Sequence, residues 1–173
     1  GVSTDTGDLT GEVLETRPVP AVSIGQLMGV AASFEGERMQ TPPAYSAVKV
    51  GGKALYKYAR EGQKVQAKAR RISIHRMEVM GHGDDWVDLR VVCSRGTYVR
   101  VLAEEFGQAL GTCAHLVALR RMASGPFTLE AGVNFEALSL MASDSDDWRR
   151  VLRPRRGEER VQWRSQEDMR TML

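Results

Sequence analysis

The stretch Cys93-Ser-Arg-Gly-Thr-Tyr-Val-Arg100 decides how this chain is interpreted. Apolar residues over 87–92 predict a strand before it, Gly96 breaks that strand, and a helical pattern then begins with Tyr98 and Arg100 in its first turn. A helix N-terminus disfavours a cation, so we expect an anion beside Arg100, either a carboxylate or a phosphate. The alternative is an arginine that is simply solvated at the surface.

The charge is distributed unevenly along the chain. The whole protein carries a net charge of only +2, yet residues 38–76 hold ten Lys or Arg against one Glu, whereas residues 1–37 hold six acids against one Arg. Tyrosines alternate with lysines in the basic block, which suits stacking on RNA bases and contact with phosphates. A solvated surface is the plainer explanation of such a block. The proposed RNA-binding residues in this block are Tyr45, Ser46, Lys49, Lys53, Tyr56 and Lys57.

Three stretches of the sequence carry a family resemblance. They are Gly1-Val-Ser-Thr-Asp-Thr-Gly-Asp-Leu-Thr-Gly11, the segment from Gln40 to Gly62, and the region from Cys93 through Gly111-Thr-Cys-Ala-His-Leu-Val-Ala-Leu-Arg-Arg121. Together they resemble the bacterial tRNA pseudouridine synthase B (TruB) family. Their order makes the resemblance specific, and it extends from residue 1 to about residue 140.

The order of elements predicts a mixed α/β (α+β) fold, which the resemblance specifies as a partial pseudouridine synthase catalytic domain with a mixed or antiparallel sheet and helices on one face. The expected helices follow Ser23 as far as Gly36, then cover 53–60, 98–110 and 134–140. The expected strands cover 44–50, 71–80, 86–93 and 115–122, with turns at 51–52 and 124–126. We expect a catalytic portion over 1–122 with an RNA-gripping loop at about 40–62, the start of the TruB C-terminal region over 123–141, and a divergent charged tail over 142–173.

Composition excludes several classes of protein. No apolar run is long enough for a membrane span, and two cysteines make neither a disulfide framework nor a metal site. The three histidines lack metal-ligand spacing. We therefore expect no metal, no cofactor and no membrane partner, and a reducing cytoplasm as the compartment. The oligomeric state is not readable, although a monomer is favoured.

The resemblance implies isomerisation of uridine 55 in the TΨC loop of tRNA to pseudouridine, with the TΨC stem-loop as partner. In the family an aspartate in a Gly-Thr-Leu-Asp-Pro stretch attacks the nucleotide, and no such stretch occurs here. Arg100 matches the arginine that pairs with that aspartate, Tyr98 supports it, and Leu119 matches the apolar residue beside the target base. Arg120 and Arg121 complete the proposed RNA contacts.

Two functional classes follow. The first is a tRNA pseudouridine synthase represented by an N-terminally truncated sequence, and the second is a noncatalytic RNA-binding remnant of that family. A plain α/β interaction domain is a weaker third interpretation. Because the nucleophilic motif is missing, we expect these 173 residues alone to be inactive, with Arg100 awaiting a carboxylate from outside the chain. We also expect exposed sheet edges and marginal stability.

Overall fold

The computed structural model describes residues 1–144, apart from the side chains of residues 131 and 141–144. Within this part the chain forms two units, residues 1–118 and the residues from 119 onward, which are described separately. The tail expected over 142–173 lies outside the described residues from residue 145 on.

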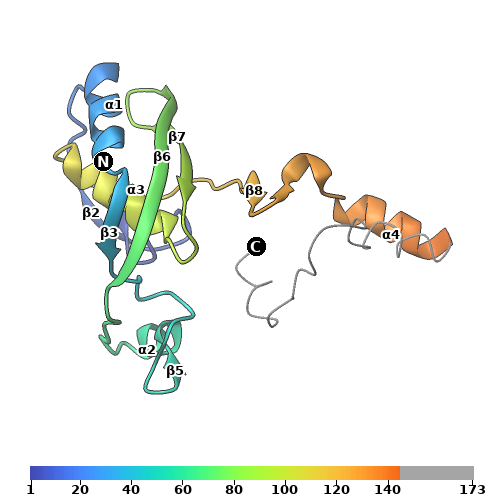
Figure 1. Cartoon of the computed structure of the whole chain (residues 1–173). Coiled ribbons are helices and arrows are strands. Elements are labelled where there is room, and N and C mark those ends of the chain that lie inside the picture. The colour runs from blue at the N-terminus through green and yellow to red at the C-terminus, as the bar shows by residue number, and fades with distance from the viewer. Residues whose placement is uncertain (145–173) are drawn as a thin grey trace. The chain divides into compact units, whose positions relative to one another are not determined.

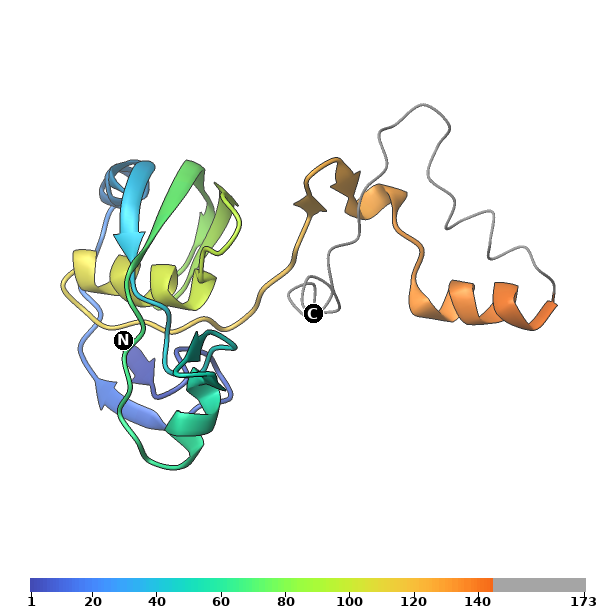
Figure 2. The ribbon, with the colours of Figure 1, turned by 60° about the horizontal axis from the view of Figure 1, so that its bottom comes forward.

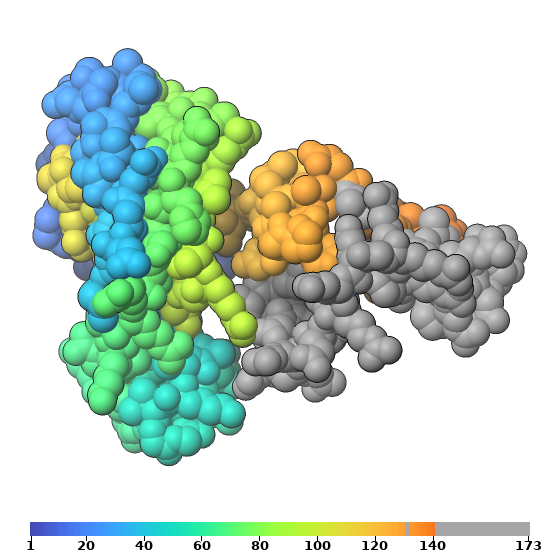
Figure 3. All heavy atoms as spheres, viewed as in Figure 1, coloured from blue at the N-terminus to red at the C-terminus, as the bar shows by residue number. Residues whose placement is uncertain are grey.

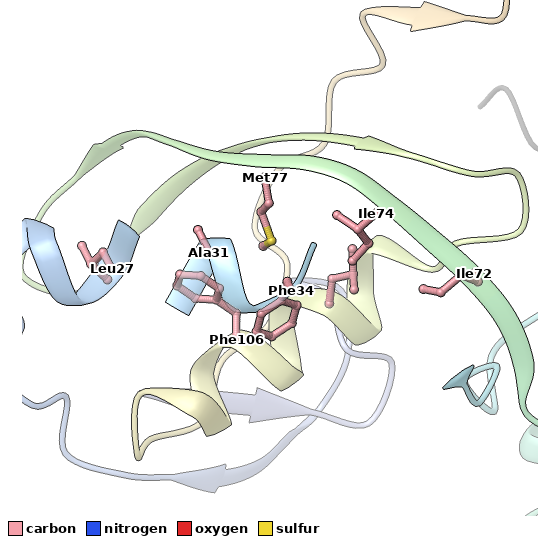
Figure 4. Packing of buried hydrophobic residues seen from close by; sticks show 8 residues of the cluster. Leu27, Ala31, Phe34, Ile72, Ile74, Met77 and Phe106 are labelled. Atoms are coloured by element: carbon pink, nitrogen blue, oxygen red, sulfur yellow. The ribbon is translucent and has the colours of Figure 1, made fainter. Parts of the chain in front are cut away.

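A three-stranded antiparallel sheet forms the centre of the first unit. Its strands are β3 (Gly36–Gln40), β6 (Arg70–His82) and β7 (Val87–Cys93), in the order β3-β6-β7. Helices α1 (Ile24–Ser33) and α3 (Val99–Ala109) both lie against one face of this sheet (Figures 1 and 4). The predicted mixed α/β fold with helices on one face is confirmed, and the hairpin predicted over 71–93 corresponds to β6 and β7.

The hydrophobic core lies between this sheet and the two helices (Figure 4). The aromatic rings of Phe34 and Phe106 meet with their centroids 5.9 Å apart, which joins the end of α1 to α3. Burying each large apolar side chain contributes about 1.5–3 kcal/mol, so this cluster is what fixes α3 on the sheet. Its buried members are Leu27, Ala31, Phe34, Ile72, Ile74, Met77, Leu102 and Phe106.

The helix predicted after Ser23 begins there and is capped as the sequence suggests. The Ser23 hydroxyl accepts a hydrogen bond from the backbone N–H of Gln26, and the Gln26 side chain accepts one from the Ser23 N–H. This reciprocal pair satisfies two N–H groups that a helix start leaves open. The helix ends at Ser33 rather than at Gly36, whose φ of +104° instead turns the chain into β3.

Residues 41–69, which follow β3 and precede β6 in the sequence, form a small lobe (Figures 1 and 2). It is here called the basic lobe. Strands β4 (Lys49–Val50) and β5 (Lys53–Ala54) pair around Gly51 and Gly52, both with positive φ, and α2 (Leu55–Arg60) follows. The strand predicted over 44–50 is wrong except for its last two residues, and the helix predicted from residue 53 begins at residue 55. The short hairpin takes up the residues nearest the glycine turn. In the space-filling view the lobe protrudes beyond the sheet (Figure 3).

The N-terminal strands β1 (Val2–Thr4) and β2 (Val13–Thr16) pair antiparallel on the side of α3 away from the sheet (Figure 4). The strand predicted over 115–122 is wrong, because within the first unit that segment gains only one bridge. The Leu116 N–H donates to the Gly7 carbonyl at 2.9 Å, and the Leu9 N–H donates to the Leu116 carbonyl at 2.9 Å. A strand needs partners along its length, and over residues 115–118 the backbone–backbone hydrogen bonds involve Leu116 alone.

The second unit begins at residue 119 and contains short elements. Strands β8 (Ala123–Ser124) and β9 (Phe127–Thr128) pair around Gly125, as the predicted turn requires. A short 3-10 helix η1 (Leu129–Ala131) follows, and then α4 (Phe135–Asp144). The Asn134 side chain accepts a hydrogen bond from the Ala137 N–H at 2.7 Å, which confirms the predicted helix start.

Candidate active site around Arg100

Arg100 lies in the first turn of α3, two residues after the N-cap residue Tyr98. Its Nη1 donates to the Thr6 carbonyl at 2.8 Å and to Asp8 Oδ2 at 3.1 Å, and its Nη2 donates to the Tyr45 carbonyl at 2.7 Å. Only 24% of the side chain is exposed. The guanidinium therefore joins α3 to the N-terminal loop and to the basic lobe, which a solvated surface arginine would not do.

The anion expected beside Arg100 is the carboxylate of Asp8. Arg100 therefore does not lack a carboxylate partner within the chain, because the turn after β1 brings Asp8 onto the start of α3. That the nucleophilic carboxylate lies outside the chain remains a prediction. Asp8 Oδ1 also accepts hydrogen bonds from the Thr6 hydroxyl at 2.8 Å, the Thr10 hydroxyl at 2.7 Å and the Thr10 N–H at 3.1 Å. Partial burial raises the pKa of Asp8, but the bonds from Thr10 and Thr6 and the charge of Arg100 outweigh it and hold the pKa below its usual range. Both oxygens of the Asp8 carboxylate thus have partners, and one of these partners is Arg100.

Gly7 allows this close approach. Its φ of +72° is a conformation that favours glycine, and a Cβ there would lie 2.5 Å from Glu104 Oε1. Glu104 follows Arg100 by one helical turn and is half-buried. Burial raises the pKa of the Glu104 carboxyl, and the charge of Arg100 offsets this only in part. Arg100 therefore has two carboxylates near it, Asp8 in direct contact and Glu104 one turn further along α3.

Tyr98 is held through its backbone by a buried glutamine. The Tyr98 N–H donates to Gln40 Oε1 at 2.8 Å, and Gln40 Nε2 donates to the Tyr98 carbonyl at 3.2 Å. Gln40 is only 2% exposed and is the last residue of β3. The support that Tyr98 gives to Arg100 remains a prediction, and the contact available for it is this backbone pair.

Two of the residues predicted to bind RNA face inward or toward the N-terminal loop. The Asp5 carboxylate near the Tyr45 hydroxyl raises the pKa of Tyr45. Ser46 is 5% exposed, and its hydroxyl has no hydrogen-bond partner within the described part of the chain. In this conformation Ser46 has no surface to offer RNA, and its contribution is to the packing of the lobe.

The other predicted lobe residues lie at its surface. Lys53 forms an ion pair with Glu61 and stands over the Tyr58 ring, with its Nζ 4.5 Å from the ring centroid. Tyr56 is half-buried beneath the guanidinium of Arg60. Lys49 and Lys57 are exposed. Both exposed lysines therefore lie where a polyanion can contact the lobe.

A groove beside β4 adds cations that the sequence analysis missed. Its apolar residues are Val48, Val50 and Ala67, and its other lining residues are Lys49, Gln66, Lys68 and Arg70. Among residues 1–144 no carboxylate lines this groove, whereas a second groove near the end of α1 is lined by Glu35, Glu37 and Glu105. The basic lobe thus concentrates positive charge on a recessed surface.

Leu119, Arg120 and Arg121 belong to the second unit and are exposed, Leu119 at 64%. The structure brings Arg100, Tyr98 and Tyr45 together in the first unit. The roles of the three residues of the second unit remain predictions.

Within residues 1–144 no group of three or more His, Cys, Asp and Glu side chains is arranged to hold a metal ion. None of the helices in this range combines the length and apolar character needed to cross a membrane.

Two family models cover most of the chain. The model for the N-terminal domain of TruB family pseudouridylate synthases matches residues 1–99, and the model for the tRNA pseudouridylate synthase B C-terminal domain matches residues 100–156. The chain belongs to the TruB family. The match continues to residue 156, so the likeness to TruB proteins extends beyond residue 140. The domain boundary proposed at residue 122 remains a prediction.

Curated TruB proteins are similar over most of this chain. The tRNA pseudouridine synthase B of Ralstonia pickettii (strain 12J) is 48% identical over 149 residues, which is 84% of this chain and 46% of that protein. The Burkholderia mallei (strain NCTC 10247) protein of the same name is 46% identical, over 86% of this chain and 49% of its own length. The chain thus spans about half the length of the curated relatives it matches.

A solved structure shares the fold. A chain in the crystal structure of a Cbf5-Nop10-Gar1 complex superposes with a TM-score of 0.60 and 28% identity, over 80% of this chain and 39% of that one. This likeness agrees with the sheet and helices described above for a TruB protein.

The site residues that sequence reasoning missed lie inside the TruB motifs. Asp8 ends the Thr-Asp-Thr-Gly-Asp run, and Gln40 begins the second motif. The available signal was a polar residue at the edge of each motif. What the sequence could not show was that both side chains meet the start of α3.

Proposed function

We propose that this chain is the arginine-bearing part of a tRNA pseudouridine synthase that converts uridine 55 of the TΨC loop to pseudouridine in the cytoplasm. The observation that carries this proposal is Arg100 in a TruB family chain, held by three hydrogen bonds at the start of α3 and bonded directly to the base of the basic lobe. The reaction is an isomerisation: the bond from ribose C1′ to uracil N1 breaks, a bond from C1′ to C5 forms, and the C5 proton is released while N1 gains one.

Arg100 contributes charge and position to this chemistry. A guanidinium stays protonated at neutral pH, so Arg100 is neither nucleophile nor base. Its role is to orient and stabilise carboxylates, of which Asp8 is one. The family's Gly-Thr-Leu-Asp-Pro nucleophile does not occur in these residues, so the nucleophilic carboxylate comes from a segment outside them and residues 1–173 alone do not isomerise uridine.

The basic lobe binds the TΨC stem-loop through phosphates. Its groove is lined by Lys49, Lys68 and Arg70. Each phosphate contact releases counterions, so RNA binding weakens as salt rises. A uridine leaves its stack at a cost of a few kcal/mol, which these contacts offset.

The activity test compares two proteins. Residues 1–173 and a fusion that adds the family's Gly-Thr-Leu-Asp-Pro segment upstream are incubated with a tRNA transcript labelled with tritium at uridine C5. We expect tritium release from the fusion only, and its loss in the fusion carrying Arg100→Ala. Robust release by residues 1–173 alone would contradict the proposal and require another nucleophile.

The RNA-binding test measures affinity for the TΨC stem-loop across a salt series. We expect Lys49→Ala/Lys53→Ala and Lys68→Ala/Arg70→Ala each to weaken binding and to flatten the salt dependence by roughly one to two phosphate contacts. Arg71→Ala/Arg76→Ala is the matched control, because it removes two cations of β6 that lie outside the basic lobe. Equal effects of all three pairs would show that only net charge matters.

A second candidate is a noncatalytic RNA-binding remnant. The observation that favours it is the Asp8–Arg100 ion pair, since Arg100 already has a carboxylate within the chain. The two candidates differ in one result: an inactive fusion that still binds the stem-loop with the expected salt dependence would support the remnant.

A further inference from the structure

Gln40 stands at the base of the basic lobe. It is the last residue of β3 and pairs across the sheet with Arg70, the first residue of β6. The whole lobe, residues 41–69, is therefore inserted between two paired residues. The two chain connections between the lobe and the sheet therefore meet at this pair.

The Gln40 side chain does not point into the lobe but bonds to the start of α3. It accepts from the Tyr98 N–H at 2.8 Å and donates to the Tyr98 carbonyl at 3.2 Å, so both halves of the amide are used. At 2% exposure, neither bond faces competition from bulk water. The side chain thus holds the N-cap residue of α3 as a neighbouring strand would.

We propose that Gln40 is a positioning residue that fixes Arg100 relative to the basic lobe. Arg100 follows Tyr98 by two residues, and its Nη2 bond to the Tyr45 carbonyl is a second link from the lobe to the same helical turn. RNA gripped by the lobe then meets the guanidinium at one set position. Gln40 touches no reacting group and acts through Tyr98 and Arg100. The link to RNA rests on the proposed function, whereas the hold on Arg100 does not.

The amide chemistry makes the proposal specific. Glutamine both accepts and donates, ionised glutamate only accepts, and methionine, of similar length, does neither. Loss of the hold on Arg100 should therefore increase in the order Gln40, Gln40→Glu, Gln40→Met.

The first test follows the Tyr98 amide and the Arg100 Nε–H signal by NMR in the full 173-residue chain. We expect Gln40→Met to accelerate hydrogen exchange at the Tyr98 amide about tenfold and to move the Arg100 signal toward that of free arginine. Gln108→Met is the matched control, because it makes the same change at an exposed position on α3 and should alter neither signal. If Gln40→Met does not fold, Gln40→Glu keeps the acceptor bond and should give an intermediate shift. A folded variant with an unchanged Arg100 signal would overturn the proposal and leave Gln40 a packing residue.

The second test adds the TΨC stem-loop. In wild type we expect RNA to shift the Arg100 signal, and in Gln40→Met to bind within about twofold of wild type without that shift. In the fusion that carries the nucleophile segment, Gln40→Met should lower kcat about tenfold while KM stays within about twofold. An RNA-induced shift that persists in Gln40→Met, or a loss confined to KM, would refute the coupling. If wild type binds no RNA, the proposed function fails, and the first test alone decides the role of Gln40.

Discussion

Replacing Asp8 should destabilise the chain far more than replacing an exposed aspartate. Asp8 accepts three hydrogen bonds through Oδ1 and an ion pair through Oδ2, and its side chain is 26% exposed. A hydrogen bond contributes about 0.5–1.5 kcal/mol net to stability, and a fully exposed ion pair contributes at most about 1 kcal/mol. Because Asp8 is partly exposed, each of its bonds is taken near the lower end of its range. The expected loss of stability in Asp8→Ala is then about 2–3 kcal/mol. That loss is larger than the effect of most surface substitutions.

Urea denaturation at two pH values measures this loss and its electrostatic share. The depressed pKa of Asp8 means that its ionisation favours the folded state above the ordinary value of 3.8, and that this contribution is lost as pH falls through the lower folded value. Asp8→Asn should therefore be clearly less stable than wild type at pH 7, with the difference shrinking below about pH 4. Asp84→Ala, in the exposed turn between β6 and β7, is the control and should change stability by less than about 0.5 kcal/mol. Equal stabilities of Asp8→Ala and Asp84→Ala would refute the role of Asp8.

Three other changes are expected to have measurable effects on stability. Gly7→Ala should lower the melting temperature by the equivalent of about 1–3 kcal/mol through its positive φ and the contact with Glu104, whereas Gly29→Ala, in open space on α1, should be neutral or stabilising. Phe106→Ala should cost about 3–5 kcal/mol in urea denaturation, and a loss below about 1 kcal/mol would show that this core does not hold α3. Glu104→Gln should be more stable than wild type at pH 7, because the raised pKa of Glu104 means that its charge disfavours the folded state above the ordinary value of 4.5. That difference should vanish below pH 4.5, and a less stable variant at pH 7 would contradict the assignment.

The sheet and its helices were predictable because their signals are local. Alternating apolar residues set β6 and β7, and Ser23 with Gln26 forms a capping pair that is visible in the sequence. The strand predicted after Gly111 was wrong because its formation depends on a distant partner. Its apolar residues are typical of a strand, but a strand forms only where a neighbouring strand hydrogen-bonds to its backbone. The local sequence does not indicate whether such a neighbour is present.

The sequence predicted the cation of the candidate site, Arg100, but not the residues that contact it. The strand-to-helix junction identified Arg100, and the expected anion is present. Asp8 lies ninety-two residues away in the sequence and Gln40 lies fifty-eight residues from Tyr98, so each contact depends on the tertiary fold. Sequence spacing predicts which side chains are neighbours within one helix or strand. It does not predict which carboxylate from another element contacts Arg100.

These contacts explain why the second and third TruB motifs belong to one site. The second motif begins at Gln40, whose amide holds Tyr98, and continues to Tyr45, whose carbonyl accepts from Arg100. Both contacts end on the first turn of α3, which the third motif supplies. Moving that turn relative to the base of the lobe requires these hydrogen bonds to break. In this arrangement the surface that would hold RNA and the cation that would orient the reacting carboxylate are two ends of one hydrogen-bonded unit.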